Sequence, residues 1–159
     1  MRQARSHFSK SELLRRAQIA LPACACSITD STVTLLGQPE VYWTNTALAH
    51  EGNPMFAWLL RAGPGWFLVG EFVWCAIIVA VVALLPGLFG LMTATAVSVG
   101  HTYGALTWLI IVIPIIGLYP VFLLYSIAPV YQTYLYLRPR LRSITADGAT
   151  VSRARTSVA

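Results

Sequence analysis

Residues 66–137 read WFLVGEFVWCAIIVAVVALLPGLFGLMTATAVSVGHTYGALTWLIIVIPIIGLYPVFLLYSIAPVYQTYLYL and contain one formally charged side chain, Glu71. No water-facing fold hides so long an apolar stretch, whereas apolar runs of about 20 residues suit membrane-spanning helices. Proline and glycine interrupt the stretch at residues 86–87 and 114–117. Because these residues favour turns, the stretch predicts three successive spans, at about residues 66–85, 88–111 and 118–137.

The composition of the whole chain agrees with a membrane location. The chain has 159 residues, of which 57% are hydrophobic and 11% are charged, and its mean hydropathy is +0.65. A soluble domain carries roughly a quarter charged residues, so a water-soluble globule is excluded. A further span is predicted at about residues 17–37. This span contains Asp30, several threonines and a proline, so we expect it to face protein over much of its surface.

The basic residues predict the topology. Of the eleven Lys and Arg residues, five lie within residues 2–16, five within residues 138–155, and the last is Arg61. Lys and Arg near the ends of spans are retained on the cytoplasmic side, so both termini are predicted to be cytoplasmic and the number of spans even. The predicted fold class is therefore all-α, with four transmembrane helices in an antiparallel bundle in the bacterial inner membrane.

Three segments follow from this topology. Residues 1–16 form a basic cytoplasmic segment, residues 17–142 form the membrane domain, and residues 143–159, rich in Ser, Thr, Ala and Gly, are predicted to be a disordered cytoplasmic tail. Within the membrane domain, residues 38–65 form an outer loop that includes a short interfacial helix. The basic residues are confined to the flanks, which favours the lipid bilayer as a partner and argues against nucleic acid.

Polar side chains inside the predicted spans mark a candidate cluster. A charge in the middle of a span costs at least ~2.5–3.5 kcal/mol, so Asp30, Glu71 and His101 need partners, protonation or a wet cavity. At about 1.5 Å per residue, all three lie in one layer roughly 8–15 Å below the outer surface. We therefore expect them to meet. With the polar residues nearby, the candidate cluster comprises Asp30, Thr34, Glu71, His101 and Tyr103.

Two interpretations of this cluster stay open. It is either a structural polar network that fixes the register of the helices, or a site open to the outer face that binds a cation, a proton or a polar lipid head group. The outer loop adds candidates that are either ligands or solvated loop residues, namely Glu40, His50, Glu51 and Asn53. The sequence identifies no metal and no cofactor.

Two further patterns predict local structure. Gly100 and Gly104 form a G-x-x-x-G pair, which predicts close approach of a second helix. Pro54 restricts Asn53 to an extended conformation, so this pair predicts a rigid entry to a short helix beginning near Met55. For Asn53 and Pro54 we therefore favour a structural role.

No complete catalytic motif is present. The sequence contains no H-E-x-x-H metal motif, no G-x-S-x-G nucleophile motif and no P-loop pattern. Nucleophilic hydrolysis is unsupported and no catalytic residue is assigned. An intramembrane enzyme that uses the acids and His101 for acid–base chemistry is the weakest of the functional hypotheses.

The chain also resembles a known family. Asp30-x-x-x-Thr34 followed by Glu51-x-Asn53-Pro54 is similar to the D-x-x-x-T and E-x-N-P motifs of a family of small bacterial multi-span membrane proteins of unknown function. The resemblance covers about residues 26–108. A longer gap separates the motifs here, so Glu40-x-x-x-Thr44 also satisfies the first motif. The resemblance implies a fold and a set of residues to mutate, and it implies no reaction.

Two functional hypotheses follow from the sequence. The first is a non-enzymatic accessory or assembly component that binds the helices of other membrane protein subunits. The alternative is a binding or transport-like module with a cation, proton or lipid head-group site in its outer half. A separation of more than about 8 Å between Asp30, Glu71 and His101 would exclude the site of the second hypothesis. A wet cavity around them that opens to the outer side would count against the first hypothesis.

Overall fold

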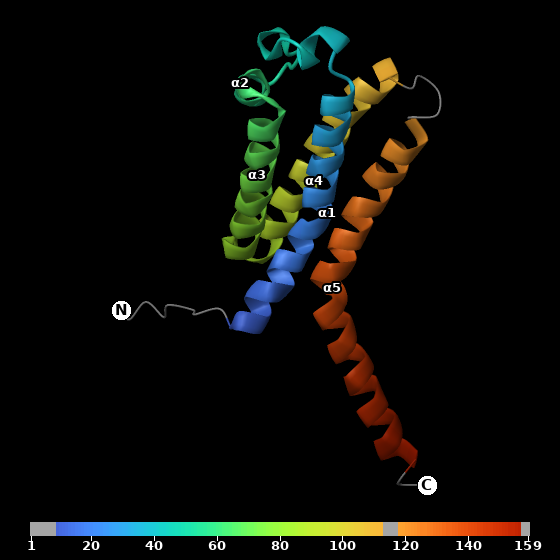
Figure 1. Cartoon of the computed structure of the whole chain (residues 1–159). Helices are drawn as coiled ribbons and strands as arrows, with labels where there is room; N and C mark the ends of the chain where they lie inside the picture. Colours follow the sequence, from blue (N-terminus) through green and yellow to red (C-terminus); the bar gives the residue numbers. More distant parts are fainter. Residues whose placement is uncertain (1–8, 113–117, 157–159) are drawn as a thin grey trace.

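The computed structural model describes residues 9–112 and 118–156, and this part of the chain is all-α, with no strand (Figure 1). The α-helices are α1 (Lys10–Leu36), α2 (Pro54–Ala62), α3 (Pro64–Leu84), α4 (Gly87–Val112) and α5 (Leu118–Thr156). Two short 3-10 helices, η1 (Glu40–Trp43) and η2 (Thr46–Leu48), lie between α1 and α2. By length and composition, α1 and α3 are able to cross a membrane.

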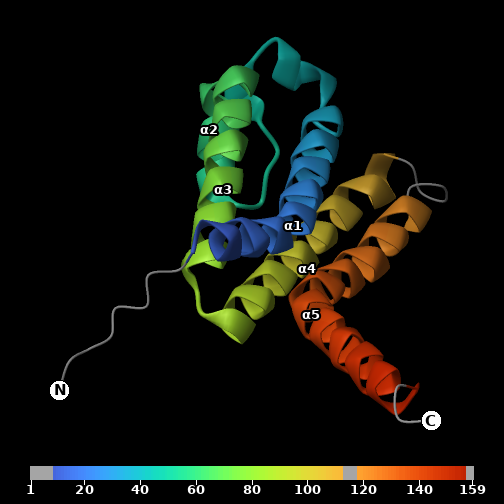
Figure 2. The ribbon, with the colours of Figure 1, turned by 90° about the horizontal axis from the view of Figure 1, so that it is seen from below.

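Helix α1 is the central element of the bundle. It begins after Ser9, whose side-chain oxygen accepts a hydrogen bond from the Glu12 N–H at 3.2 Å. The helix then continues without a break into the predicted first span, and it packs against α3, α4 and α5 (Figure 2). Its buried face carries small residues such as Ala20 and Ala23, which allow the neighbouring helices to approach closely. The expectation that this polar helix faces protein is confirmed.

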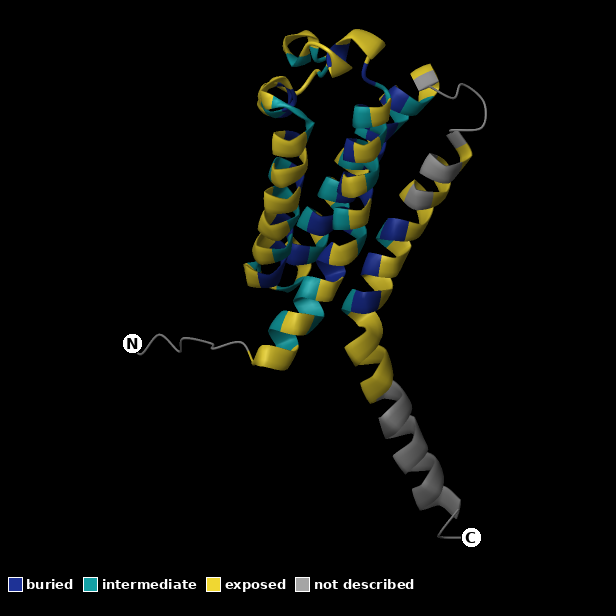
Figure 3. Cartoon of the chain, in the orientation of Figure 1, coloured by how far each residue is buried: buried dark blue, intermediate teal, exposed yellow. Residues whose placement is uncertain are grey.

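Helices α3 and α4 are joined by a tight turn at residues 85–87. Gly87 has φ +40°, a left-handed conformation that favours glycine. A Cβ at Gly90 would lie 2.8 Å from the Val82 carbonyl oxygen, so a glycine is needed where the helices meet. The outward face of α3 carries exposed apolar residues, including Leu68, Phe72 and Ile77 (Figure 3).

Helix α5 differs from the expectation at its C-terminal end. We predict a span that ends at residue 137 and a disordered tail over residues 143–159, but α5 continues to Thr156. After Pro139 the segment contains no proline and several Ala and Arg residues, which have high helix propensity. The reversal predicted at residues 114–117 lies within the gap between the two described ranges.

A buried polar contact joins α5 to α4. The Gln132 side chain is fully buried. Its Nε2 donates to Ser98 Oγ at 2.9 Å, and its Oε1 accepts from Thr95 Oγ1 at 3.2 Å. Since the amide uses both its donor and its acceptor, this contact fixes the relative register of the two helices.

The segment between α1 and α3 forms a cap over one end of the bundle, which we call the loop end. Three of its residues, Tyr42, Phe56 and Leu60, form an apolar cluster with Phe67 of α3. The Tyr42 hydroxyl donates to the Leu60 carbonyl oxygen at 3.2 Å, and burial raises the pKa of this phenol. The Asn53 side chain caps α2 by accepting from the Met55 N–H at 3.1 Å. The predicted rigid helix entry at Asn53 and Pro54 is therefore confirmed.

Candidate functional site

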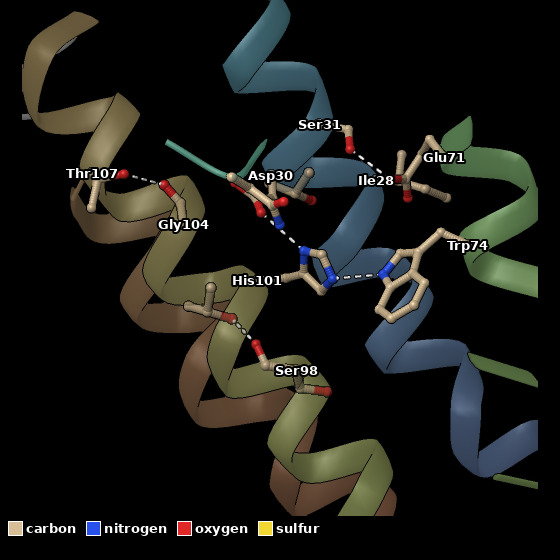
Figure 4. A network of polar contacts seen from close by, with 12 residues as sticks. Ile28, Asp30, Ser31, Glu71, Trp74, Ser98, His101, Gly104 and Thr107 are labelled. Carbon is tan, nitrogen blue, oxygen red and sulfur yellow. Dashed lines mark hydrogen bonds and ion pairs between the residues drawn. The ribbon is translucent and has the colours of Figure 1, made fainter. Parts of the chain in front are cut away.

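One imidazole links three helices beneath the cap. His101 Nδ1 on α4 lies 2.9 Å from Oδ2 of Asp30 on α1 (Figure 4). The indole Nε1–H of Trp74 on α3 donates to His101 Nε2, also at 2.9 Å. Two hydrogen bonds thus connect α1, α4 and α3 through a single side chain.

These two bonds determine the tautomer of His101. Trp indole is only a donor, so His101 Nε2 must accept and carries no proton. A neutral imidazole with a bare Nε2 is protonated at Nδ1, so Nδ1–H donates to Asp30. The imidazole is therefore neutral in this arrangement. It orients the Asp30 carboxyl group without supplying a positive charge to it.

Glu71 lies in a neighbouring polar group. Its Oε2 accepts from Ser31 Oγ at 2.6 Å, and its Oε1 accepts from Cys75 Sγ at 3.2 Å. The side chain is 6% exposed and does not line the pocket next to Asp30. Because Ser31 directly follows Asp30, the two polar groups are adjacent on α1. The predicted residues are thus brought together as a contacting Asp30–His101 pair with Glu71 behind it.

A partly open pocket of about 550 Å³ adjoins this pair, between α1, α4 and the loop before α2. Its polar lining includes two carboxyl groups and two imidazoles, and no Lys or Arg is found among the lining residues that the structure describes. Aromatic rings form much of the remaining wall. The polar residues are Asp30, Ser31, Thr34, His50, Glu51, Asn53, His101 and Thr107, and the aromatic ones are Phe56, Phe67, Trp74, Tyr103 and Trp108.

The two candidate packing glycines have different environments. A Cβ at Gly104 would lie 2.6 Å from Asp30 Oδ2 and 2.7 Å from Oδ1, so the absence of a side chain makes room for the carboxyl group. At Gly100, no heavy atom lies within 4 Å of such a Cβ. The close approach predicted from the G-x-x-x-G pair therefore occurs at Gly104. Gly100 instead borders the pocket.

Three of the four outer-loop candidates line the pocket, and the fourth does not. His50, Glu51 and Asn53 border the pocket, and the His50 ring packs edge-on against Trp108 with centroids 6.0 Å apart. Glu51 Oε1 also accepts from the Asn53 N–H at 2.7 Å, which supports the turn into α2. Glu40 is exposed at the start of η1 and does not line the pocket.

Two tryptophans of the site are not identified from the sequence alone. Trp74 lies well inside a predicted span, and Trp108 lies three residues before the predicted end of another, near the membrane interface where tryptophan is common. A buried indole N–H needs an acceptor. The position of Trp74 inside an apolar span therefore indicates that a polar partner lies nearby. Trp108 covers Gly37 and packs on His50, and no sequence spacing indicates this.

The chemistry of the site is not defined further by metal ligands or by similarity to known proteins. In residues 9–112 and 118–156, no group of three or more His, Cys, Asp and Glu side chains is placed to hold a metal ion. No family model, curated protein or solved structure matches this chain. The resemblance carried by Asp30, Thr34, Glu51, Asn53 and Pro54 stays a prediction.

Proposed function

We propose that the chain is a four-span inner-membrane protein whose termini are both cytoplasmic. Helices α1, α3 and α4 and the first part of α5 would be the spans. The apolar residues exposed on α3 would contact lipid, and the basic residues would lie at the cytoplasmic ends of α1 and α5. The loop end, with its exposed Trp43 and Trp58, would then face the outside of the inner membrane.

Cysteine labelling tests this topology. A Gly52→Cys side chain would have no heavy atom near its Cβ, so a membrane-impermeant maleimide is expected to label it in intact spheroplasts. Ser143→Cys is the matched control at an exposed position beyond the last span, and labelling there is expected only after the membrane is permeabilised. The unsubstituted chain gives the background from the three native cysteines. Equal labelling of both variants in intact spheroplasts would contradict the topology.

We further propose that the pocket binds the positively charged group of a small organic cation. The observation that carries this proposal is the hydrogen bond from Trp74 to His101 Nε2, because it implies a neutral imidazole and leaves the Asp30 carboxylate without a cationic partner. Oδ1 of Asp30 has no hydrogen-bond partner among the described residues. A bound cation would supply the missing charge.

The walls of the pocket favour an ammonium group. Aromatic faces attract cations by about 0.5–2 kcal/mol, and five aromatic residues line the same pocket as Asp30. A volume of about 550 Å³ also lies within the range of small-molecule sites. A cation or proton site was the alternative hypothesis from the sequence. The pocket beside Asp30 makes it the preferred one.

The binding proposal is tested with tetramethylammonium as the probe. Trp74 and Trp108 line the pocket, so binding is expected to change the intrinsic tryptophan fluorescence of the purified protein in a saturable manner. Asp30→Asn keeps an oxygen that accepts from His101 but removes the charge. We expect it to weaken binding about tenfold, which corresponds to about 1.4 kcal/mol.

Two controls make this test specific. Glu40→Gln removes one negative charge at an exposed residue outside the pocket and is expected to bind like the unsubstituted chain. Sodium chloride at equal ionic strength controls for screening. An Asp30→Asn protein that binds tetramethylammonium with unchanged affinity would refute the proposed cation site.

An accessory or assembly role is the second candidate. It is favoured by the C-terminal part of α5, which extends beyond the ends of the other helices (Figure 1). A projecting helical arm offers a surface to another protein. Purification from native membranes in mild detergent separates the two candidates, because a stable stoichiometric partner would support the accessory role.

A further inference from the structure

A second pocket, of about 440 Å³, lies between α1 and α5 at the end of the bundle opposite the cap. Among the described side chains that line it, three are arginines and none is acidic. Leu135 and Pro139 give it an apolar wall. The complete described lining is Arg15, Gln18, Leu135, Arg138, Pro139 and Arg142.

Glu12, which lies one helical turn before Arg15, is already paired. Glu12 Oε2 accepts from Arg15 Nε at 2.9 Å, and its Oε1 accepts from Arg15 Nη2 at 2.7 Å and from Arg16 Nε at 2.7 Å. Hydrogen bonds from Arg15 and, to a smaller extent, from Arg16 lower the pKa of Glu12 to about 2, so the carboxylate stays ionised at neutral pH. One negative charge is thus shared between two arginines, and the cluster keeps a net positive charge.

The pocket retains donors for a ligand. Glu12 occupies Nε and Nη2 of Arg15 and thereby holds this guanidinium in a fixed orientation, with Nη1 unbonded in the described structure. Arg138 has no hydrogen-bond or ion-pair partner within the described ranges. Two guanidinium groups that converge from different helices suit the bidentate recognition of a phosphate.

The pocket lies at the ends of the apolar segments. Arg16 Nη1 donates to the carbonyl oxygen of Leu85, just after α3 ends, at 2.9 Å. Arg138 follows directly after Leu137, the last residue of the apolar stretch. A ligand phosphate at Arg138 would therefore lie at head-group depth, and an attached acyl chain could follow the exposed apolar side of α5 at Val130 and Tyr131.

We propose that this pocket binds the phosphate of an anionic phospholipid from the cytoplasmic leaflet. The inference rests on the proposed membrane topology and is independent of the cation pocket at Asp30. A basic recess between two helices that opens beside an apolar helix face fits a molecule with a phosphate and a hydrocarbon tail. A free phosphate shares the first feature and lacks the second.

The test measures lipid binding to the full-length protein in detergent by native mass spectrometry. Phosphatidylglycerol is expected to bind more tightly than phosphatidylcholine. Arg138→Gln is expected to weaken phosphatidylglycerol binding about five- to tenfold. Arg140→Gln, which makes the same substitution two residues away on the same helix but outside the lining, is expected to bind like the unsubstituted chain.

Three outcomes would overturn the proposal. Equal losses in the Arg138 and Arg140 variants would mean non-specific attraction, and equal binding of the two lipids would mean no charge recognition. Displacement of the lipid by millimolar inorganic phosphate would mean a free-phosphate site. Arg138→Lys, which keeps the charge and loses the planar fork, is expected to bind with intermediate affinity and provides a second variant if Arg138→Gln fails to fold. Tetramethylammonium binding, measured on the same samples, reports separately on the Asp30 pocket.

Discussion

Replacing Phe67 by Ala is expected to lower the free energy of unfolding by about 3 kcal/mol. The Phe67 ring is 1% exposed and packs edge-on against Phe56, with centroids 5.8 Å apart. It belongs to the apolar cluster that holds the cap on the bundle, and it also lines the pocket. Truncation would leave a cavity where α2, α3 and the loop meet. The pocket would then lose one wall as well as its support.

Thermal unfolding in detergent measures this effect. For a chain of this size, about 3 kcal/mol corresponds to a fall in the midpoint of roughly 6–12 °C. Phe72→Ala is the matched control, because it removes the same ring from the same helix at a side chain that is 79% exposed. We expect its midpoint to change little. Equal midpoints for the two variants would show that Phe67 is not a core residue.

Replacing Gly104 by Ala is expected to displace the Asp30 carboxyl group from α4. The new methyl group would lie 2.6 Å and 2.7 Å from the carboxyl oxygens, which is closer than nonbonded atoms approach. The carboxyl group or the helix must move, and overpacking of this kind costs about 1–3 kcal/mol. Since Asp30 is hydrogen-bonded to His101, this bond would be strained or broken. We expect a lower unfolding midpoint together with weaker tetramethylammonium binding.

A second glycine on the same helix, Gly100, provides the control for this prediction. Gly100→Ala places a methyl group one helical turn away on α4, where no heavy atom lies within 4 Å. Alanine has the higher helix propensity, so stability should be unchanged or slightly increased. A comparable loss of stability in both variants would mean that helix packing depends on the G-x-x-x-G pair as a unit and not on the contact at Asp30.

Much of the fold can be predicted from the distribution of apolar and turn-forming residues along the sequence. The helix boundaries near residues 64–87 follow from proline and glycine, which act locally on the backbone. The cap of α2 follows from Asn53 and Pro54 for the same reason. The continuation of α5 to Thr156 was missed, because a Ser-, Thr- and Gly-containing composition suggests disorder while several Ala and Arg residues favour a helix.

The candidate site can be predicted from the sequence only in part. The cost of burying polar groups identified Asp30, Glu71 and His101 as residues in need of partners, and depth alone placed them in one layer. Which partner each residue takes depends on the rotation of the helices about their axes, and the sequence does not fix this rotation. Trp74 was therefore missed as the partner of His101, and Ser31 as the partner of Glu71.

The neutral imidazole of His101 has a mechanical consequence. Trp74 can donate to Nε2 only while this nitrogen carries no proton, so the hydrogen bond between α3 and α4 requires one particular tautomer of the imidazole. The bond from Nδ1–H to Asp30 requires the same tautomer. The position of a single proton on the ring thus allows His101 to join three helices.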